Sequence, residues 1–429
     1  MQFIVQPSAI SNATVSVPGD KSVSHRALML GAIAEDRTNI SGFLAGEDCL
    51  ATLIALESMG VNIEQTNSTE IVIRGVGLHG LTKPENELDL GNSGTAMRLM
   101  TGILSGQSFS SVLTGDKSLQ SRPMQRVITP LSMMGASIDS NDGHPPLAVT
   151  GKAQLKGIDY TLPVASAQVK SALLLAGLYA DGITTVEEPA VTRDHTERML
   201  VSMGANVERD GGRISMMGKQ VLRGSDIQVP ADLSSASFVI LATLIAQQAE
   251  VLIEGVGVNP TRTGVIDILQ AMGGDIRLEN ARLYGEEPVA DIRVRSSILH
   301  GGPVDSRLVS LAIDEFPVLF VAAAAAKGAT RFSDVGELRV KESDRIATMA
   351  TGLRSLGIRV DESDDGAVVH GGEITGGRVD SQGDHRVAMS LAVAGTIAAN
   401  EVKVDNVAAV NTSFPGFADC LSGIGVAIQ

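Results

Sequence analysis

The sequence predicts an α/β protein built from six similar units, three in each of two related halves. A short phrase, in which a helix-like apolar stretch is followed by Gly and then by a strand-like tail, returns six times along the 429 residues. The first copy is Leu56–Ile63. The glycines at the centre of the copies are Gly60, Gly135, Gly204, Gly273, Gly357 and Gly425. Since Gly adopts the left-handed conformation without steric cost, each is predicted to end a helix just before a strand.

The two halves are related at a larger scale. Val17–Asp20 reads Val-Pro-Gly-Asp, and Val229–Asp232 repeats the phrase as Val-Pro-Ala-Asp 212 residues later. The sequence therefore predicts one domain at 19–230 and a second domain made of 1–18 with 231–429. Because clefts at domain interfaces are favoured ligand sites, we expect the functional site between the two domains.

Each unit is predicted as strand, helix, strand, helix and a final strand pair. The β-branched segment Glu70–Arg74 indicates a strand. Apolar residues at helical spacing predict the helices. In chain order these are Ala27–Ala34, Leu50–Met59, Thr95–Leu104, Met124–Met134, Ala167–Tyr179, Glu197–Met203, Ala236–Gln247, Arg262–Met272, Glu315–Ala326, Asp344–Leu356, Arg386–Ala398 and Phe417–Ile424.

The composition narrows the function classes. A hydrophobic fraction of 44% with 19% charged residues is typical of a globular protein. The net charge of −15 and the 3% aromatic content argue against nucleic acid and anionic membranes as partners. Cys49 and Cys420 have no metal-ligand spacing, so we predict buried thiols and no metal. The sequence lacks a signal-peptide pattern and an uninterrupted membrane span, so we expect a cytoplasmic protein.

Two familiar-looking motifs carry no function. Gly75–Gly80 fits the GxGxxG pattern of dinucleotide-binding sites, but Pro84 blocks the helix that would hold a pyrophosphate. Gly19–Ser22 resembles the end of a phosphate-binding P-loop but lacks the Gly directly before Lys. We therefore expect no nucleotide cofactor.

Cations and small polar groups instead gather at predicted helix starts in both halves. Lys21, Ser22 and Arg26 stand at the start of one helix, where the helix N-terminus itself favours anions. Similar clusters occur at Gly91–Arg98, Arg122, Ser166–Lys170, Arg193–Glu197, Asp314–Pro317, Leu338–Arg345 and Asp384–Arg386. Any one of them could be a helix cap or a surface ion pair. Together they predict a basic site for a small, multiply anionic substrate such as a phosphorylated carboxylic acid.

These motifs also resemble those of a known family. Gly19–Arg26, Gly91–Arg98, Arg339–Arg345 and Asp384–Arg386 are similar to motifs of the enolpyruvylshikimate-phosphate synthases, and the resemblance covers the whole chain. It implies the two-domain enolpyruvyl transferase fold, with six βαβαββ units, three per domain, and the active site in the interdomain cleft. It also implies transfer of the enolpyruvyl group of phosphoenolpyruvate to the 5-hydroxyl of shikimate 3-phosphate through a tetrahedral intermediate, with release of phosphate. We expect no cofactor, a monomer, and glyphosate as an inhibitor.

The resemblance assigns roles to individual residues. Those expected to bind shikimate 3-phosphate are Lys21, Ser22, Arg26, Ser166, Ala167, Gln168, Arg193, Asp314 and Lys341. Those expected to bind phosphoenolpyruvate are Lys21, Asn92, Gly94, Arg122, Gln168, Arg345 and Arg386. The hydroxyl must lose a proton while the methylene carbon gains one, so two proton-transfer groups are required. We expect Asp314 to take the hydroxyl proton and Glu342, with Lys21, to serve the methylene carbon.

Within the family the sequence resembles class II, many of whose members tolerate glyphosate. The segments that carry this likeness are Gly19–Ser22, Ser166–Lys170, Arg193–Glu197, Asn259–Arg262 and Asn411–Pro415. Thr412 stands where class I enzymes have a Lys. Strongly tolerant members tend to have Ala where this chain has Gly94, and Gly94 leaves room for the inhibitor. The class II motifs therefore favour glyphosate tolerance, whereas Gly94 favours sensitivity.

Three other functions compete with this interpretation. The UDP-N-acetylglucosamine enolpyruvyl transferases share the fold but commonly use a loop Cys, and Thr114–Leu119 contains none. RNA-terminal phosphate cyclase also has repeated units, but the acidic charge and few aromatic residues argue against it. A non-catalytic binding protein would keep the cations but would not need both Asp314 and Glu342.

Overall fold

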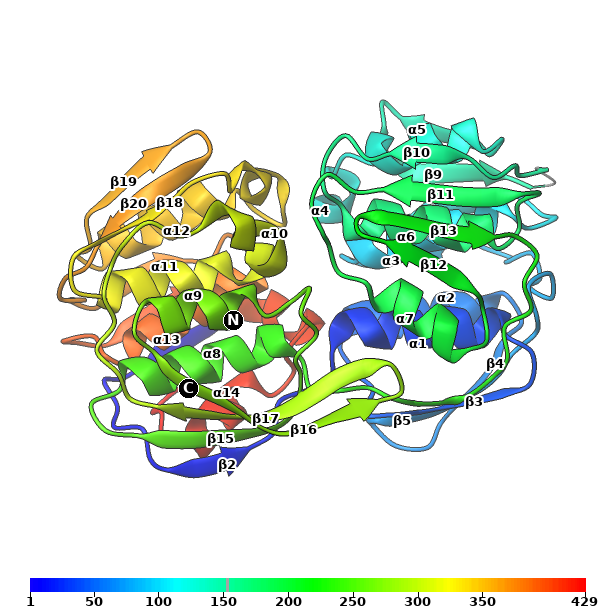
Figure 1. Cartoon of the computed structure of the whole chain (residues 1–429). Coiled ribbons are helices and arrows are strands. Elements are labelled where there is room, and N and C mark those ends of the chain that lie inside the picture. The colour runs from blue at the N-terminus through cyan, green and yellow to red at the C-terminus, as the bar shows by residue number, and fades with distance from the viewer. Residues whose placement is uncertain (152–153) are drawn as a thin grey trace. The chain divides into compact units, whose positions relative to one another are not determined.

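A computed structural model describes residues 1–151 and 154–429, which divide into two compact units. Unit 1 comprises 1–18, 230–283 and 288–429, and unit 2 comprises 19–229 with 284–287. Each unit consists of helices and three small sheets (Figure 1).

Unit 2 contains the following elements. Its helices are α1 (Lys21–Ile33), α2 (Glu47–Ser58), α3 (Gly94–Ser105), α4 (Lys117–Gln120), α5 (Gln125–Met133), α6 (Ala167–Gly177) and α7 (His195–Ser202). Its strands are β3 (Arg37–Ser41), β4 (Asn62–Gln65), β5 (Glu70–Arg74), β6 (Leu88–Asp89), β7 (Ser111–Thr114), β8 (Ser137–Asn141), β9 (His144–Thr150), β10 (Asp159–Thr161), β11 (Ile183–Glu187), β12 (Val207–Asp210), β13 (Arg213–Met217) and β14 (Asp226–Gln228).

The remaining elements fall mainly in unit 1. The helices are α8 (Leu233–Ile245), α9 (Gly264–Ala271), α10 (Val309–Ala312), α11 (Phe316–Ala325), α12 (Arg345–Ser355), α13 (His385–Gly395) and α14 (Phe417–Gly423), with 3-10 turns η1 (Ser306–Leu308), η2 (Ile313–Glu315), η3 (Gly336–Val340) and η4 (Val407–Thr412). The strands are β1 (Gln2–Val5), β2 (Ala13–Val15), β15 (Glu250–Gly257), β16 (Asp275–Tyr284), β17 (Glu287–Arg295), β18 (Ala329–Phe332), β19 (Val360–Ser363), β20 (Gly366–His370), β21 (Gly377–Asp380) and β22 (Val402–Asp405).

The three sheets of unit 2 follow one plan. Their strand orders are β14-β3-β5-β4, β6-β7-β9-β8 and β10-β11-β13-β12. In each sheet the first two strands are parallel, and the strand pair that ends the unit joins in antiparallel fashion. This is the βαβαββ order that the repeat predicts. The first sheet takes its opening strand, β14, from the far end of the unit 2 chain, which closes the set of three.

Unit 1 repeats the plan, and its first 18 residues take part in it. The sheet order β16-β17-β15-β2 places β2 parallel to β15, and the order β1-β22-β21 places β1 antiparallel to β22. The third sheet, β18-β20-β19, is extended by isolated parallel bridges from His300 to Lys327 and from Pro303 to Arg331. The predicted α/β fold of six units is therefore confirmed.

The six repeat glycines end helices as predicted. All have positive φ, from 86° at Gly60 to 105° at Gly135. After α2 the Gly60 N–H donates to the carbonyl of Glu57 at 2.9 Å, and the Val61 N–H donates to Leu56 at 3.2 Å. This pair of bonds is the Schellman motif, in which a left-handed residue satisfies the last carbonyls of a helix.

The predicted helices are all present, and two of them, α6 and α14, begin at the predicted residue. In α1 the apolar pattern begins at Ala27, but the helix itself begins at Lys21, where the polar cluster was predicted to start a helix. His25 and Arg26 interrupt the apolar pattern of this turn, yet both are buried in the fold. The polar clusters at helix starts include N-cap residues: Asp20, Ser93, Ser166, Asp344 and Asp384 each accept a hydrogen bond from a backbone N–H one turn ahead.

Buried helices form the core of each unit. In unit 1, α8, α11 and α13 pack on one another and lie between the sheets (Figure 1). In unit 2, α3 packs so closely on α6 that a Cβ added at Gly102 would lie 2.3 Å from the carbonyl oxygen of Ala172. Only Gly permits this contact between helix backbones.

One described helical run, Ser306–Ala325, is long and apolar enough to cross a membrane by length and composition alone. It consists of four successive pieces, η1, α10, η2 and α11, and most of it is buried inside unit 1. Asp314 and Glu315 lie within it. The run is therefore placed as part of the unit 1 core.

Candidate active site

The first group of site residues lies where α1 begins in unit 2. The Asp20 carboxylate accepts from the Val23 N–H at 2.8 Å and so fixes the first turn. The Lys21 ammonium forms an ion pair with Asp48 of α2, whose side chain is 5% exposed against 19% for Lys21. Asp48 thus orients the Lys21 side chain, and an anionic ligand there would compete with a carboxylate.

Arg26, one turn further on, is held by hydroxyl groups. Its Nε donates to Thr196 Oγ1 at 2.6 Å, and its Nη2 donates to Ser171 Oγ at 2.9 Å. Thr196 in turn donates to Ser171 at 2.7 Å. Burial lowers the pKa of the Arg26 guanidinium to about 10, with Glu197 and Asp20 acting in the opposite direction. At neutral pH Arg26 is therefore a charged group in fixed orientation.

A second cation of unit 2 is positioned by an amide. Arg122 donates through Nη2 to Asn92 Oδ1, and Asn92 donates to Asp116 Oδ2 at 2.7 Å. Gly94, the first residue of α3, lies beneath two guanidinium groups. A Cβ added at Gly94 would lie 2.9 Å from Arg98 Nη1 and 3.1 Å from Arg122 Nη1.

The start of α6 is tied to the start of α3. Arg98 donates to Gln168 Oε1 at 2.7 Å, and Gln168 donates from Nε2 to Thr95 Oγ1 at 2.9 Å. Both ends of the Gln168 amide are therefore engaged, so its orientation is fixed. Ser166 caps α6, since its hydroxyl accepts from the Val169 N–H at 3.4 Å.

The second group of site residues lies in unit 1, around Asp314. The Asp314 carboxylate is 3.4 Å from Lys341 Nζ and 3.5 Å from Arg345 Nη1. Its side chain is 18% exposed and that of Lys341 is 24% exposed. Arg386 donates to the backbone carbonyl of Asp314 at 3.1 Å. A carboxylate that a substrate can reach thus lies among three cations.

Arg345 is the most buried cation of this group, at 1% exposed. It donates to Glu342 Oε2 at 2.6 Å and, from Nε, to Asp384 Oδ2 at 2.8 Å. These carboxylates raise the pKa of Arg345 against the effect of burial. The Asp384 carboxyl is fully buried, yet Arg345 keeps its pKa below the usual range. Asp384 also accepts from the backbone N–H of Arg386 at 2.9 Å, so one carboxylate orients the Arg345 side chain and caps the helix that carries Arg386.

The structure thus brings the predicted residues together in two groups, one in each unit, and their individual roles stay predictions. Several orienting groups escaped sequence reasoning: Asp48, Arg98, Asn92 as the partner of Arg122, and Glu315, which lies 3.4 Å from Arg386. Arg98 and Asp384 lie within motifs that the sequence analysis singled out, so a role in the site could have been predicted for them. Asp48 lies 27 residues from Lys21 in an ordinary helix start, so no local pattern predicts its contact with Lys21.

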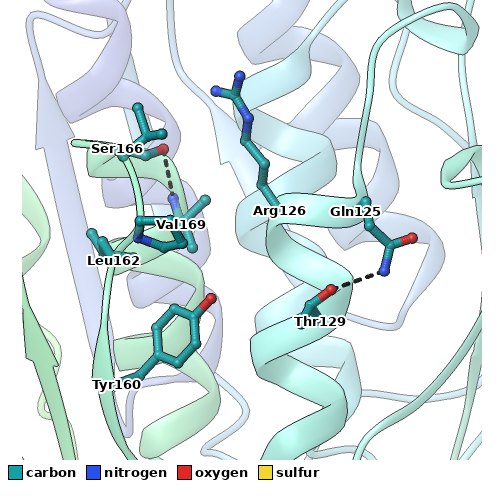
Figure 2. Close-up of a pocket in the computed structure, with 9 residues that line it drawn as sticks. Gln125, Arg126, Thr129, Tyr160, Leu162, Ser166 and Val169 are labelled. Carbon is teal, nitrogen blue, oxygen red and sulfur yellow. Dashed lines mark hydrogen bonds between the residues drawn. The ribbon is translucent and has the colours of Figure 1, made fainter.

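A pocket of about 260 Å³ lies beside Ser166 in unit 2. Figure 2 shows Tyr160, Leu162 and Val169 on one side of it and the α5 residues Gln125, Arg126 and Thr129 on the other. Its lining is mainly apolar, so it does not suit a doubly anionic phosphate. Within residues 1–151 and 154–429, no three His, Cys, Asp or Glu side chains gather as a metal site.

Comparison with known proteins gives one consistent result. The family model described as EPSP synthase (3-phosphoshikimate 1-carboxyvinyltransferase) matches residues 5–421. The chain is 56% identical to a 3-phosphoshikimate 1-carboxyvinyltransferase of Alkalilimnicola ehrlichii, covering 100% of this chain and 96% of that protein. It is 52% identical to one of Nitrosococcus oceani, with 100% and 97% coverage. A solved EPSP synthase structure from Acinetobacter baumannii has a TM-score of 0.89 at 50% identity and covers 100% of this chain and 99% of its own.

The fold of six βαβαββ units and the basic, carboxylate-containing groups define an enolpyruvyl transferase. The chain belongs to the EPSP synthase family and is a carboxyvinyl transferase of the shikimate pathway. The predicted family, fold and enzyme class are thereby confirmed.

Proposed function

We propose that this enzyme joins shikimate 3-phosphate and phosphoenolpyruvate through the residues gathered in its two units. The observation that carries the proposal is the Asp314 carboxylate, which lies within 3.5 Å of both Lys341 and Arg345. A carboxylate in this setting can accept a proton from a ring hydroxyl, and the cations beside it stabilise negative charge on the reacting groups.

The proton transfers divide between two carboxylates. Asp314 takes the proton from the 5-hydroxyl of shikimate 3-phosphate. The hydroxyl oxygen at the same time bonds to the carbon of phosphoenolpyruvate that bears the phosphate. Glu342, with Lys21, delivers a proton to the methylene carbon, which gives a tetrahedral intermediate. Loss of that proton and of phosphate then restores the carbon–carbon double bond. The charge of the adjacent carboxylate is neutralised by Arg345 and Arg386.

The substrate anions are bound by the cations at helix starts. Shikimate 3-phosphate is bound by Lys21, Ser22, Arg26, Ser166, Ala167, Gln168, Arg193, Asp314 and Lys341. Phosphoenolpyruvate is bound by Lys21, Asn92, Gly94, Arg122, Gln168, Arg345 and Arg386. The support for this assignment is that the hydrogen bonds of Arg26, Arg122, Gln168 and Arg345 fix these side chains before a ligand arrives.

The working form of the enzyme is proposed from the family resemblance and the repeat pattern of the sequence. It acts in the cytoplasm as a monomer, without cofactor or metal. The segment 19–230 acts as one domain, and 1–18 with 231–429 acts as the other. Glyphosate inhibits it by occupying the phosphoenolpyruvate site, and Gly94 leaves room for that longer molecule.

The direct test is to replace the proposed base. Asp314→Ala should lower phosphate release roughly 100- to 10,000-fold, because this is the range that a general base contributes. Binding of shikimate 3-phosphate, measured by titration calorimetry, should remain. The matched control is Asp305→Ala, which removes a carboxylate from an exposed ion pair with Arg307. Near-normal turnover of the Asp314 variant, with the control also active, would refute the assignment.

A further inference from the structure

A buried charge cluster in unit 2 takes no part in the proposed chemistry. Lys170 of α6 is 1% exposed, and its ammonium lies 2.9 Å from Glu188 Oε2 and 2.8 Å from Glu197 Oε1. The side chains of Glu188 and Glu197 are 3% and 1% exposed. Isolated charges are costly to bury, so charges retained in a core must be paired and carry some compensating benefit.

The cluster connects three parts of the chain. Lys170 belongs to α6, Glu188 follows β11, and Glu197 belongs to α7. Thr192 closes the loop between the two carboxylates, since its hydroxyl donates to Glu188 and its carbonyl lies 3.5 Å from Lys170 Nζ. The ammonium thus fixes the position of α7 relative to α6.

The parts joined in this way carry the residues proposed to bind shikimate 3-phosphate. Lys170 lies two residues from Gln168 and one turn from Ser166. The loop closed by Thr192 leads directly into Arg193. Thr196, next to Glu197, and Ser171, next to Lys170, are the two hydroxyls that hold Arg26.

The charge of Glu197 also acts on Arg26. Among the groups that favour the charged form of Arg26, Glu197 has the largest effect, ahead of Asp20. Glu197 is thus paired with Lys170 and also favours the charged form of Arg26. Arg122 is held instead by Asn92, whose amide donates to Asp116.

We propose that Lys170 and Glu197 are positioning residues for shikimate 3-phosphate, which set the spacing of the α6 start, Arg193 and Arg26. This inference rests on the proposed function, because it assigns the anion that those groups bind. It specifies that disturbing the ion pair weakens binding of shikimate 3-phosphate more than binding of phosphoenolpyruvate, because Gln168 is the one residue of the affected segments that is assigned to both.

The experiment uses two conservative substitutions in the cluster and a matched control. Glu197→Gln keeps the shape of the side chain and removes its charge, and Lys170→Arg keeps the charge and changes its geometry. Leu175→Ala, in the buried part of α6, destabilises the same helix and leaves every charge of the cluster in place. For each protein we would measure melting temperature, kcat, KM for both substrates, and the Kd of shikimate 3-phosphate by calorimetry.

We expect Glu197→Gln to raise the KM and Kd for shikimate 3-phosphate about tenfold or more and the KM for phosphoenolpyruvate less than about threefold. Lys170→Arg should shift both constants in the same sense. Leu175→Ala should lower the melting temperature and change the KM for shikimate 3-phosphate less than about twofold.

Two results would overturn the inference while leaving the proposed function intact. The first is an unchanged Kd for shikimate 3-phosphate in both Glu197→Gln and Lys170→Arg. The second is an equal rise in both KM values, or the same rise in the Leu175 control, since either would mean a general loss of structure. A wild-type protein that fails to bind shikimate 3-phosphate would instead refute the proposed function itself. Should Glu197→Gln not fold, Glu188→Gln tests the same ammonium from its other side.

Discussion

Replacing Gly94 by Ala should impair binding of phosphoenolpyruvate without destabilising the fold. Gly94 is the first residue of α3, where Ala is tolerated well, and its φ lies outside the left-handed region. The added methyl would lie 2.9 Å from Arg98 Nη1 and 3.1 Å from Arg122 Nη1. Both atoms end flexible side chains, so the guanidinium groups must move while the backbone can stay.

The magnitude follows from the bonds that this movement disturbs. Arg98 Nη1 is the atom that holds Gln168, at 2.7 Å, and Arg122 is held by Asn92. A hydrogen bond to a charged group contributes about 1.5–3 kcal/mol, and its partial loss should cost about 1.4 kcal/mol. That corresponds to a KM for phosphoenolpyruvate raised about tenfold.

The assay is phosphate release at saturating shikimate 3-phosphate with phosphoenolpyruvate varied, together with thermal unfolding. The control is Gly423→Ala, at a position where an added Cβ meets no atom within 4 Å. The reasoning would be refuted by a KM within about twofold of wild type, since both guanidinium groups would then have absorbed the methyl at no cost. A large fall in melting temperature would also refute it, because it would mean that the backbone had moved.

Two further predictions concern stability. Gly204→Ala should lower the free energy of unfolding by about 1–2 kcal/mol in urea titrations, because φ is 94° there and a Cβ meets no atom within 4 Å. Gly423→Ala should be neutral or stabilising, and equal effects of the two substitutions would show that conformation is not the cause. His25 is fully buried beside Lys21 and Arg26, and burial lowers its pKa well below the usual value. The unfolded chain therefore binds a proton below about pH 6.5 that the folded protein does not. As the pH decreases below this value, the free energy of unfolding decreases by up to about 1.4 kcal/mol per pH unit. His25→Gln should reduce the pH dependence of the free energy of unfolding between pH 7 and 5. An unchanged slope of this free energy against pH would contradict a neutral, buried imidazole.

Local chemistry explains what the sequence could predict. The glycine at the end of α2 could be placed because a left-handed helix terminus requires that residue whatever surrounds it. The polar clusters could be placed because caps and anion sites use the same backbone N–H groups. Asp384 has two roles, because it caps α13 and also orients Arg345.

Long-range pairing explains what the sequence could not predict. The burial of the first turns of α1 could not be predicted, because His25 and Arg26 look like surface residues until Thr52, Ser171 and Thr196 are known to contact them. The Lys21–Asp48 ion pair joins side chains from separate helices, and no local pattern specifies it. Lys170 and Glu197 both stood in recognised motifs, but their pairing appears only in the folded chain.

The measurement that tests the central claim most directly is phosphate release by the purified protein with both substrates and no added metal. The account predicts release only when phosphoenolpyruvate and shikimate 3-phosphate are present together, and its loss in Asp314→Ala. Absence of release from a folded protein that binds shikimate 3-phosphate would contradict the account, as would release that does not require shikimate 3-phosphate.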